Sequence, residues 1–564
     1  MRTFTRVANM SPGLRDTGDE IDAAHINELQ QAAEDLQTGA LPIALAGIEG
    51  ALGDWEYARA RVTPDVSTLT ADNIPAINQA LQDVKAAGGG VVTLPTHKQF
   101  PIKPSTSNRI LIPDNCRLDL GDARLQVASD SPTYTYIISG EGGPSVAATN
   151  ISVAGGEIDQ NPTGHVLSAA QANFQFAILT YNCDGLTVDG VNFITGSANT
   201  IAATGAENVR NVRVNQNTFT FTKDSDTAYD NSAVYLHAFN VEANDNRFYS
   251  AHSELARGCI EIHSPLAVAR GNRSWNYWTL FNLVSSGASL DGDIDRYLVD
   301  VSGNVGYGLR AGITIWPRSG TDYRGVSIND NQLYIQQVTI DEKDAHGIAF
   351  VAAEAFDGTV DGLHITDNQI TFEDGDNRTV DQHGTTISHA NTHAIHTAAH
   401  TRLRNAQIKT NTIVNAPQNG IYLGNNLFSG AEHENVLVEG NLQVNTGNNR
   451  AKHGATRSAF VFAGKFTNTR IRNNPVIVTD ADGTSDDQHY SYAYTITSGG
   501  GNVFEDNPIL VNGGYTLTEA SISSVFALRR PVAATTLGSV TGKQEVFDRY
   551  GASLGFVPIY DAIT

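Results

Sequence analysis

Acidic and imidazole side chains alternate with aliphatic ones in the short segment CIEIH (259–263). If this segment is a β-strand, Ile260 and Ile262 point to one face, and Glu261 and His263 point to the opposite face. A carboxylate and an imidazole that share a face can accept and donate protons, which is what general acid–base catalysis requires. We therefore take Glu261 as the first candidate for a catalytic carboxylate.

Segments before and after this one direct further side chains to the same face by the same alternation. In AVYLH (233–237) the outward positions are aromatic, and GITIW (312–316) ends in an aromatic residue. Tyr and Trp rings pack against the apolar face of a pyranose ring, so this face predicts a sugar-binding surface. The expected substrate-binding residues are Tyr235, His237, His263, Trp316, Arg318 and Glu354.

Hydrolysis of a glycosidic bond requires two carboxyl groups, separated by about 5–5.5 Å for retention or about 6.5–9.5 Å for inversion. The expected partners of Glu261 are Asp291 and Asp293, which lie with Asp295 in the loop SLDGDID (289–295). Glu354 lies about three repeats away along the chain and is expected to bind substrate rather than react.

Two other interpretations of these residues stay open. A lyase would need a base and a cation that neutralises a uronate, and His263 or His237 with Arg318 fits that need. Alternatively, Glu261 and His263 form a solvated ladder without catalytic function, and the aspartates of 291–295 serve only in a turn.

Metal and nucleotide chemistry lack support in the sequence. The histidine-rich segment 383–400 would present metal ligands only if it were helical, but AIHTA (394–398) has the pattern of a strand, and HExxH is absent. DGDID (291–295) and DADG (480–483) lack the glutamate of an EF-hand loop, which leaves only a looser calcium site open. GxSxG, P-loop and CxxC motifs are also absent, so no cofactor is expected.

Composition excludes several classes of partner. The chain has 564 residues and a net charge of −23, which disfavours nucleic acid and anionic membranes. Hydrophobic residues make up 40% and charged residues 17% of the chain, as in a folded protein. No signal peptide and no membrane-spanning segment is recognisable. The three cysteines, Cys116, Cys183 and Cys259, are too few and too widely spaced for a disulfide framework, so we expect buried thiols.

The elements that must position these residues come from an internal repeat that begins near residue 150. Twelve segments share a short alternating strand, a polar or glycine pair, an asparagine and an apolar residue, as in RNVRVNQNTF (210–219). A second strand precedes most of them. A period of 25 to 43 residues without crossover helices predicts a β-solenoid, in which stacked rungs share one core. The asparagine is expected at a left-handed turn, with side-chain amides forming a ladder between rungs. The expected anchors are Asn192, Asn217, Asn246, Asn272, Asn304, Asn331, Asn368, Asn411, Asn441, Asn474 and Asn507.

Three segments outside the repeat have distinct patterns. Residues 16–38 and 73–87 predict helices; the first carries an apolar stripe that would pack on a partner or on its own copies. The C-terminal QEVFD and LGFVPIYD, around RYGAS, predict a hairpin.

The entry region, with a helix followed by GGGVVTLP (88–95), ILIPDNCRLDLGDARL (110–125) and ISVAGGEIDQN (151–161), resembles the pectate-lyase-like right-handed β-helix superfamily. It is similar there to the capped first rungs of phage tailspikes, and the C-terminal segment resembles that of phage minor tail proteins. The resemblance implies an all-β, right-handed parallel β-helix with an N-terminal helical segment and a small C-terminal β module. The polygalacturonase motifs are not matched, since Gly-His-Gly is absent, so no catalytic residue is transferred from that family.

The resemblance also implies a division of the chain and a biological role. We expect a virion-attachment segment (1–55), a cap with the first rungs (56–148), a substrate-binding and catalytic β-helix (149–514) and a C-terminal β module for trimerisation or tail association (515–564). The expected protein is a homotrimer in the virion tail, joined through its N-terminus to other tail proteins, that recognises and depolymerises a host surface polysaccharide. The alternative interpretations are a polysaccharide lyase and a non-catalytic receptor-binding rod.

Overall fold

The computed structural model describes residues 61–69, 71–165, 175–195, 199–222, 232–251, 258–284, 298–316, 323–335, 345–350, 359–373, 393–397, 402–424, 432–446, 458–478, 491–498, 501–505, 507, 509–511, 540–547 and 553–560. The chain divides into two compact units, Met1–Lys223 and Asp224–Thr564, and each is described by itself. The predicted helix at 16–38 lies outside the described residues.

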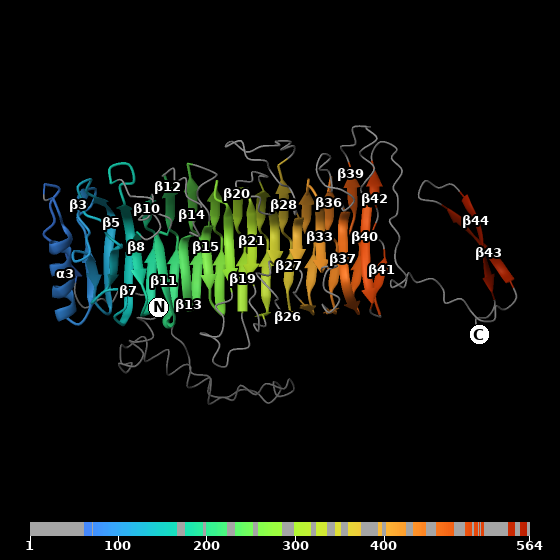
Figure 1. Cartoon of the computed structure of the whole chain (residues 1–564), viewed down its shortest axis with the longest axis horizontal. Helices are drawn as coiled ribbons and strands as arrows, with labels where there is room; N and C mark the ends of the chain where they lie inside the picture. The colour runs from blue at the N-terminus through green and yellow to red at the C-terminus, as the bar shows by residue number, and fades with distance from the viewer. Residues whose placement is uncertain are drawn as a thin grey trace, which may run out of the picture. The chain divides into compact units, whose positions relative to one another are not determined.

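Unit 1 begins with the helix predicted around residues 73–87, which the structure places as α3 (Ile74–Ala86). Pro75 occupies the first turn, where its missing N–H costs nothing. Gly88 follows the helix with φ 90°. The helix buries one apolar face, so it covers the end of the strand stack in unit 1 (Figure 1). The residues of this face are Ile74, Ile77, Ala80, Leu81 and Val84.

The strands of unit 1 stack in parallel and in register. β1 (Arg61–Val62) pairs with β2 (Gly90–Thr93), which pairs with β5 (Cys116–Val127); β5 pairs with β7 (Ala148–Asp159), β7 with β9 (Cys183–Asp189), and β9 with β11 (Ile201–Asn215). Within this stack the fully buried residues Val92, Leu118, Val153, Val188 and Val214 are successive register partners. Apolar residues that repeat at one register position therefore form a continuous core, as the repeat predicts.

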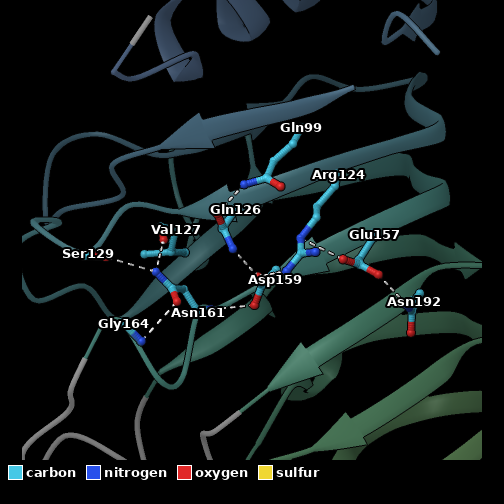
Figure 2. A network of polar contacts seen from close by, with 10 residues as sticks. All are labelled: Gln99, Arg124, Gln126, Val127, Ser129, Glu157, Asp159, Asn161, Gly164 and Asn192. Carbon is cyan, nitrogen blue, oxygen red and sulfur yellow. Dashed lines mark hydrogen bonds and ion pairs between the residues drawn. The ribbon is translucent and has the colours of Figure 1, made fainter. Parts of the chain in front are cut away.

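A second row of unit 1 is held together by polar side chains, which Figure 2 shows. Arg124 forms ion pairs with Glu157 (Nε–Oε1, 2.8 Å) and with Asp159, whose Oδ2 accepts hydrogen bonds from the Arg124 guanidinium and from Gln126 Nε2 (2.6 Å). Asp159 is 2% exposed, and its Oδ1 accepts the backbone N–H of Asn161 (2.7 Å). Both oxygens of Asp159 accept hydrogen bonds from the protein, so this network stabilises the contacts between neighbouring rungs.

Unit 2 stacks rungs of parallel strands, which we group into rows A, B and C (Figure 1). From β22 (Tyr323–Arg324) onward row B holds two short strands per rung, each with its own ladder of partners. Row A contains β13 (Ser232–Asn244, its first half), β15 (Gly258–His263), β18 (Thr279–Val284), β21 (Ala311–Trp316), β25 (His346–Phe350), β29 (His393–Thr397), β33 (Asn419–Gly424), β37 (Ser458–Thr467) and β40 (Ser491–Ser498). Row B contains β16 (Leu266–Arg270), β19 (Leu298–Ser302), β22 (Tyr323–Arg324), β23 (Val326–Asn329), β26 (Thr359–Asp361), β27 (His364–Thr366), β30 (Arg402–Arg404), β31 (Gln407–Lys409), β34 (Glu432–Glu434), β35 (Leu437–Glu439), β38 (Arg470–Arg472) and β41 (Val503–Glu505).

Row C completes each rung. It contains β14 (Arg247–Ser250), β17 (Arg273–Trp275), β20 (Val305–Leu309), β24 (Gln332–Ile335), β28 (Gln369–Phe372), β32 (Thr412–Val414), β36 (Leu442–Val444), β39 (Val476–Val478) and β42 (Ile509–Val511). Each strand pairs in parallel with its counterpart in the next rung, for example β21 with β25 and β24 with β28. This arrangement is a parallel β-helix, which confirms the fold that the repeat predicts.

The predicted asparagine ladder is present at the turn between rows B and C of unit 2. Each side-chain Nδ2 donates to the Oδ1 of the next asparagine at 2.8–3.0 Å. The ladder runs through Asn246, Asn272, Asn304, Asn331, Asn368, Asn411, Asn441, Asn474 and Asn507.

Two details of the predicted turn are wrong. From Asn246 to Asn474, the left-handed residue is the one before the ladder asparagine, such as Asp330 (φ 56°) or Asp367 (φ 58°), and the ladder residue itself uses its side chain between rungs. Asn192 is also not an anchor: it is the register partner of Thr218 in β12 (Thr218–Phe221), and its Nδ2 donates to Glu157 Oε2 (2.5 Å). Asn217 is the corner residue of unit 1 that donates to Val188 O (3.0 Å).

Three smaller expectations can be compared with the structure. The C-terminal hairpin is confirmed as β43 (Val540–Phe547) antiparallel to β44 (Ser553–Tyr560). All three cysteines are buried free thiols. Among the described helices, none is long and apolar enough to cross a bilayer.

Candidate functional site

Glu261 and His263 lie on the outward side of row A and contact each other directly. The His263 Nε2 lies 2.8 Å from Glu261 Oε1, and Ser232 Oγ donates to Glu261 Oε2 at 3.0 Å. The strand alternation that the sequence predicts is confirmed, since Ile260 and Ile262 belong to the core. The two candidate residues therefore form a hydrogen-bonded acid–imidazole pair.

This pair is not a solvated ladder, because Glu261 and His263 are each only 8% exposed. A carboxylate removed from water needs hydrogen-bond donors, and here Ser232 and His263 supply them. Each oxygen of Glu261 has one protein partner and keeps a second lone pair, which can accept a proton or a hydroxyl group from a ligand. These two contacts fix the orientation of the Glu261 carboxylate.

Rings surround His263 on its own face of the row. The ring centroids of Tyr235 and His237 each lie 5.2 Å from that of His263, at interplanar angles of 49° and 45°. Register explains the grouping, since Tyr235 is the partner of Glu261, and His237 is the partner of His263. Four of the predicted site residues thus form one cluster on β13 and β15.

The other predicted residues are less closely placed. Trp316 is half-buried at the end of β21, two rungs from the cluster. Two rungs correspond to roughly 10 Å, at about 4.8 Å per rung. Asp291, Asp293, Arg318 and Glu354 lie outside the described residues, so a second carboxylate for Glu261 stays a prediction. The register partner of Glu261 on β18 is the amide Asn282.

A polar stripe continues along row A beyond the cluster, and the sequence reasoning missed most of it. Thr314, the register partner of Asn282, contacts His346 (Oγ1–Nε2, 2.9 Å). The pKa of His346 is lowered to about 3, mainly by burial and to a smaller extent by the neighbouring charges of His396 and Arg310. This imidazole is therefore neutral at pH 7 and acts as a hydrogen-bonding group rather than a cation.

The stripe ends in a group of stacked rings on β29 and β33. The His396 ring stacks on Tyr422 with a centroid distance of 5.0 Å and an interplanar angle of 17°. His393 contacts Asn419 (Nδ1–Nδ2, 3.1 Å), and burial lowers the pKa of His396 to about 4. Aligning the row A segments by register would have found Asn282, Thr314 and Tyr422, because they belong to one column of successive register partners. That column runs through Glu261, Asn282, Thr314, Ala349, His396 and Tyr422.

One buried cation lies beside this stripe. The Arg310 guanidinium lies 4.5 Å from the ring centroid of Trp278, and Arg310 is 6% exposed. A guanidinium held over an aromatic face keeps its charge and can neutralise an anionic group in a desolvated site. Arg310 is therefore a cation close to the polar stripe. The predicted Arg318 lies outside the described residues.

The structure gives no support for a metal site in the part of the chain that it describes. Within those ranges, no three His, Cys, Asp or Glu side chains are grouped closely enough to hold an ion. His393 and His396 lie on the predicted strand, β29, and not on a helix. Both calcium-loop candidates, 291–295 and 480–483, lie outside the described residues.

Comparisons with known proteins bear on the fold. No protein-family model matches the chain, and no curated protein matches it in sequence. A solved structure of a tailspike variant of E. coli bacteriophage HK620 in complex with pentasaccharide matches with a TM-score of 0.51 and 14% identity, over 80% of this chain and 78% of that chain. A second variant of the same tailspike, also in complex with pentasaccharide, matches with a TM-score of 0.51 and 14% identity, over 79% and 78%. The chain therefore has a tailspike-like right-handed parallel β-helix fold.

Proposed function

We propose that this protein is a phage tailspike that recognises a host cell-surface polysaccharide on row A of unit 2 and cleaves it with Glu261. The observation that carries the proposal is the desolvated Glu261–His263 pair, oriented by Ser232 and flanked by Tyr235 and His237. The HK620 tailspike, whose fold this chain shares, is described in complex with pentasaccharide.

In this proposal, each group has a distinct role. Glu261 transfers a proton to or from the glycosidic oxygen or a water molecule, and His263 holds it in position. Tyr235 and Trp316 pack on sugar rings, while His237, Thr314 and Asn282 hydrogen-bond sugar hydroxyl groups. The second carboxyl comes from the loop with Asp291 and Asp293, and Arg318 and Glu354 bind neighbouring sugars. The protein acts as a homotrimer in the virion tail, attached through its N-terminal segment.

Purified protein incubated with surface polysaccharides from candidate host strains tests this function. New reducing ends that disappear in Glu261→Gln, but persist in Glu434→Gln, are the expected result. Glu434 is an exposed carboxylate of row B, so it controls for the loss of one charge. Cleavage that persists in Glu261→Gln would refute the assignment of Glu261. Absorbance of an unsaturated uronate would instead show elimination, with His263 or His237 as the base.

A further inference from the structure

A second set of exposed side chains lies on row C of unit 2, on a different strand of each rung from the Glu261 cluster. Outward-pointing residues there form two columns, because alternate residues of a strand share a face. Successive register partners in the first column are Arg247, Arg273, Val305 and Gln332, and in the second Tyr249, Trp275, Tyr307 and Tyr334.

The second column is an aromatic ladder that is open to solvent at one end. Tyr249 is 45% exposed and Trp275 is 49% exposed, which is unusual for rings of this size. The Trp275 ring stacks on Tyr307 with a centroid distance of 4.2 Å and an interplanar angle of 19°. No ring contact joins Trp275 to Tyr249 among the described residues, so the indole is stacked on one face only.

The first column places two arginines side by side. Arg247 and Arg273 are register partners in adjacent strands, and both are exposed. Their backbones are about 4.8 Å apart, and like charges in this position destabilise a sheet. Neither arginine forms an ion pair in the described part of a chain whose net charge is −23. Two uncompensated cations together in an acidic protein indicate a site for an anion.

Row B shows how the same fold compensates arginines that have no ligand to bind. There Arg324 is the register partner of Asp361, Asp361 of Arg404, and Arg404 of Glu434, so charges alternate along the column. The pairing of Arg247 with Arg273 departs from this arrangement, and it does so directly beside Trp275. An anionic ligand bound between the two guanidinium groups would offset their electrostatic repulsion.

We propose that this face, formed by Arg247, Arg273, Tyr249, Trp275, Tyr307 and Tyr334, is a second, non-catalytic site for an acidic glycan. The two guanidinium groups bind a sugar carboxylate, and the aromatic ladder packs against the adjoining sugar rings. The rung spacing of about 4.8 Å is close to the length of one pyranose unit, so an extended chain meets one ring per sugar. The inference rests on the proposed polysaccharide recognition and adds a holding site that raises avidity.

Calorimetric titration of the full-length protein with tetragalacturonate, oligohyaluronate and oligosialate tests this site, with maltotetraose as the neutral counterpart. The expected result is binding of at least one acidic oligosaccharide, weakened by salt, and no binding of maltotetraose. The double variant Arg247→Ala/Arg273→Ala should lose affinity roughly tenfold or more, and Trp275→Ala about tenfold. The matched double variant Arg324→Ala/Arg404→Ala removes the same charge from row B and should stay within about twofold of wild type.

Several results would overturn the proposal. These are failure of the wild type to bind any of the three acidic oligosaccharides, equal loss in both arginine double variants, or a change of oligomeric state in Trp275→Ala, which would place this face between copies. Far-ultraviolet circular dichroism and melting temperature confirm that each variant is folded. Glu261→Gln should retain oligosaccharide binding here, so cleavage of host polysaccharide and occupancy of this face fail independently.

Discussion

Replacing one asparagine of the ladder tests how the rungs of unit 2 are joined. In Asn368, Oδ1 accepts from Asn331 N (3.0 Å) and Asn331 Nδ2 (2.9 Å), while Nδ2 donates to Ile328 O (2.8 Å) and Asn411 Oδ1 (2.9 Å). Asn368→Ala removes all four hydrogen bonds at a residue that is 1% exposed. It also leaves the buried N–H of Asn331 without its acceptor.

The expected cost follows from the number of bonds. A buried hydrogen bond contributes about 0.5–1.5 kcal/mol net, and an orphaned buried donor costs about 1–3 kcal/mol, so we expect about 3–6 kcal/mol of local destabilisation. Asn329→Ala is the matched control, because half-buried Asn329 has two side-chain hydrogen bonds, with Ser327 and Thr366. Its cost should stay near about 1 kcal/mol.

Hydrogen–deuterium exchange resolves this effect, because a solenoid is stabilised by contacts between neighbouring rungs and opens locally. Amides of β24 and β28 should exchange about 10²- to 10⁴-fold faster in Asn368→Ala than in wild type, at about 1.4 kcal/mol per factor of ten. Protection that matches the Asn329→Ala control would refute the view that the ladder holds the rungs together.

Three further predictions follow from buried groups. Burial lowers the pKa of His346 in the native state to about 3. The unfolded chain therefore binds a proton at this residue below about pH 6.5, whereas the native state binds it only near pH 3. Stability should fall as pH drops through this window, by about 2 kcal/mol at pH 5, and thermal melting of His346→Gln at pH 7 and pH 5 should show a smaller loss. Burial raises the pKa of Cys116 to about 11 and that of Cys183 to about 12, so a thiol reagent at pH 8 should label neither until guanidinium unfolds the protein. Asp159→Asn should destabilise unit 1 by about 2 kcal/mol in chemical denaturation, since Arg124 loses its least exposed partner. An unchanged midpoint would contradict this.

Most of the fold could be predicted from the sequence, because each rung repeats the same alternation of apolar and polar residues. The core positions Ile260 and Ile262 follow from that alternation alone. The error at Asn192 shows where the pattern is weak: DGVNF and NQNTF align equally well in two registers one residue apart. Only the hydrogen bonds at Val191 and Asn217 distinguish them, and these depend on contacts between rungs.

Only part of the candidate site could be predicted, because contacts between rungs cannot be seen in the sequence pattern. Alternation within a strand places Glu261 and His263 on one face, but it cannot show that both are desolvated and hydrogen-bonded to each other. The contact between Thr314 and His346 joins residues that are 32 positions apart, with the strands β22, β23 and β24 of the same rung between them. Pairing at such a distance depends on the stacking register of rungs with unequal lengths, which a single repeat pattern does not encode.

The location of a bound oligosaccharide tests the central claim most directly. Crystals of Glu261→Gln soaked with a fragment of the host polysaccharide should show the sugar chain across row A, with one glycosidic oxygen within hydrogen-bonding distance of residue 261 and a ring packed on Tyr235. Density for that fragment only on other faces of the molecule, with row A empty, would contradict the proposed site.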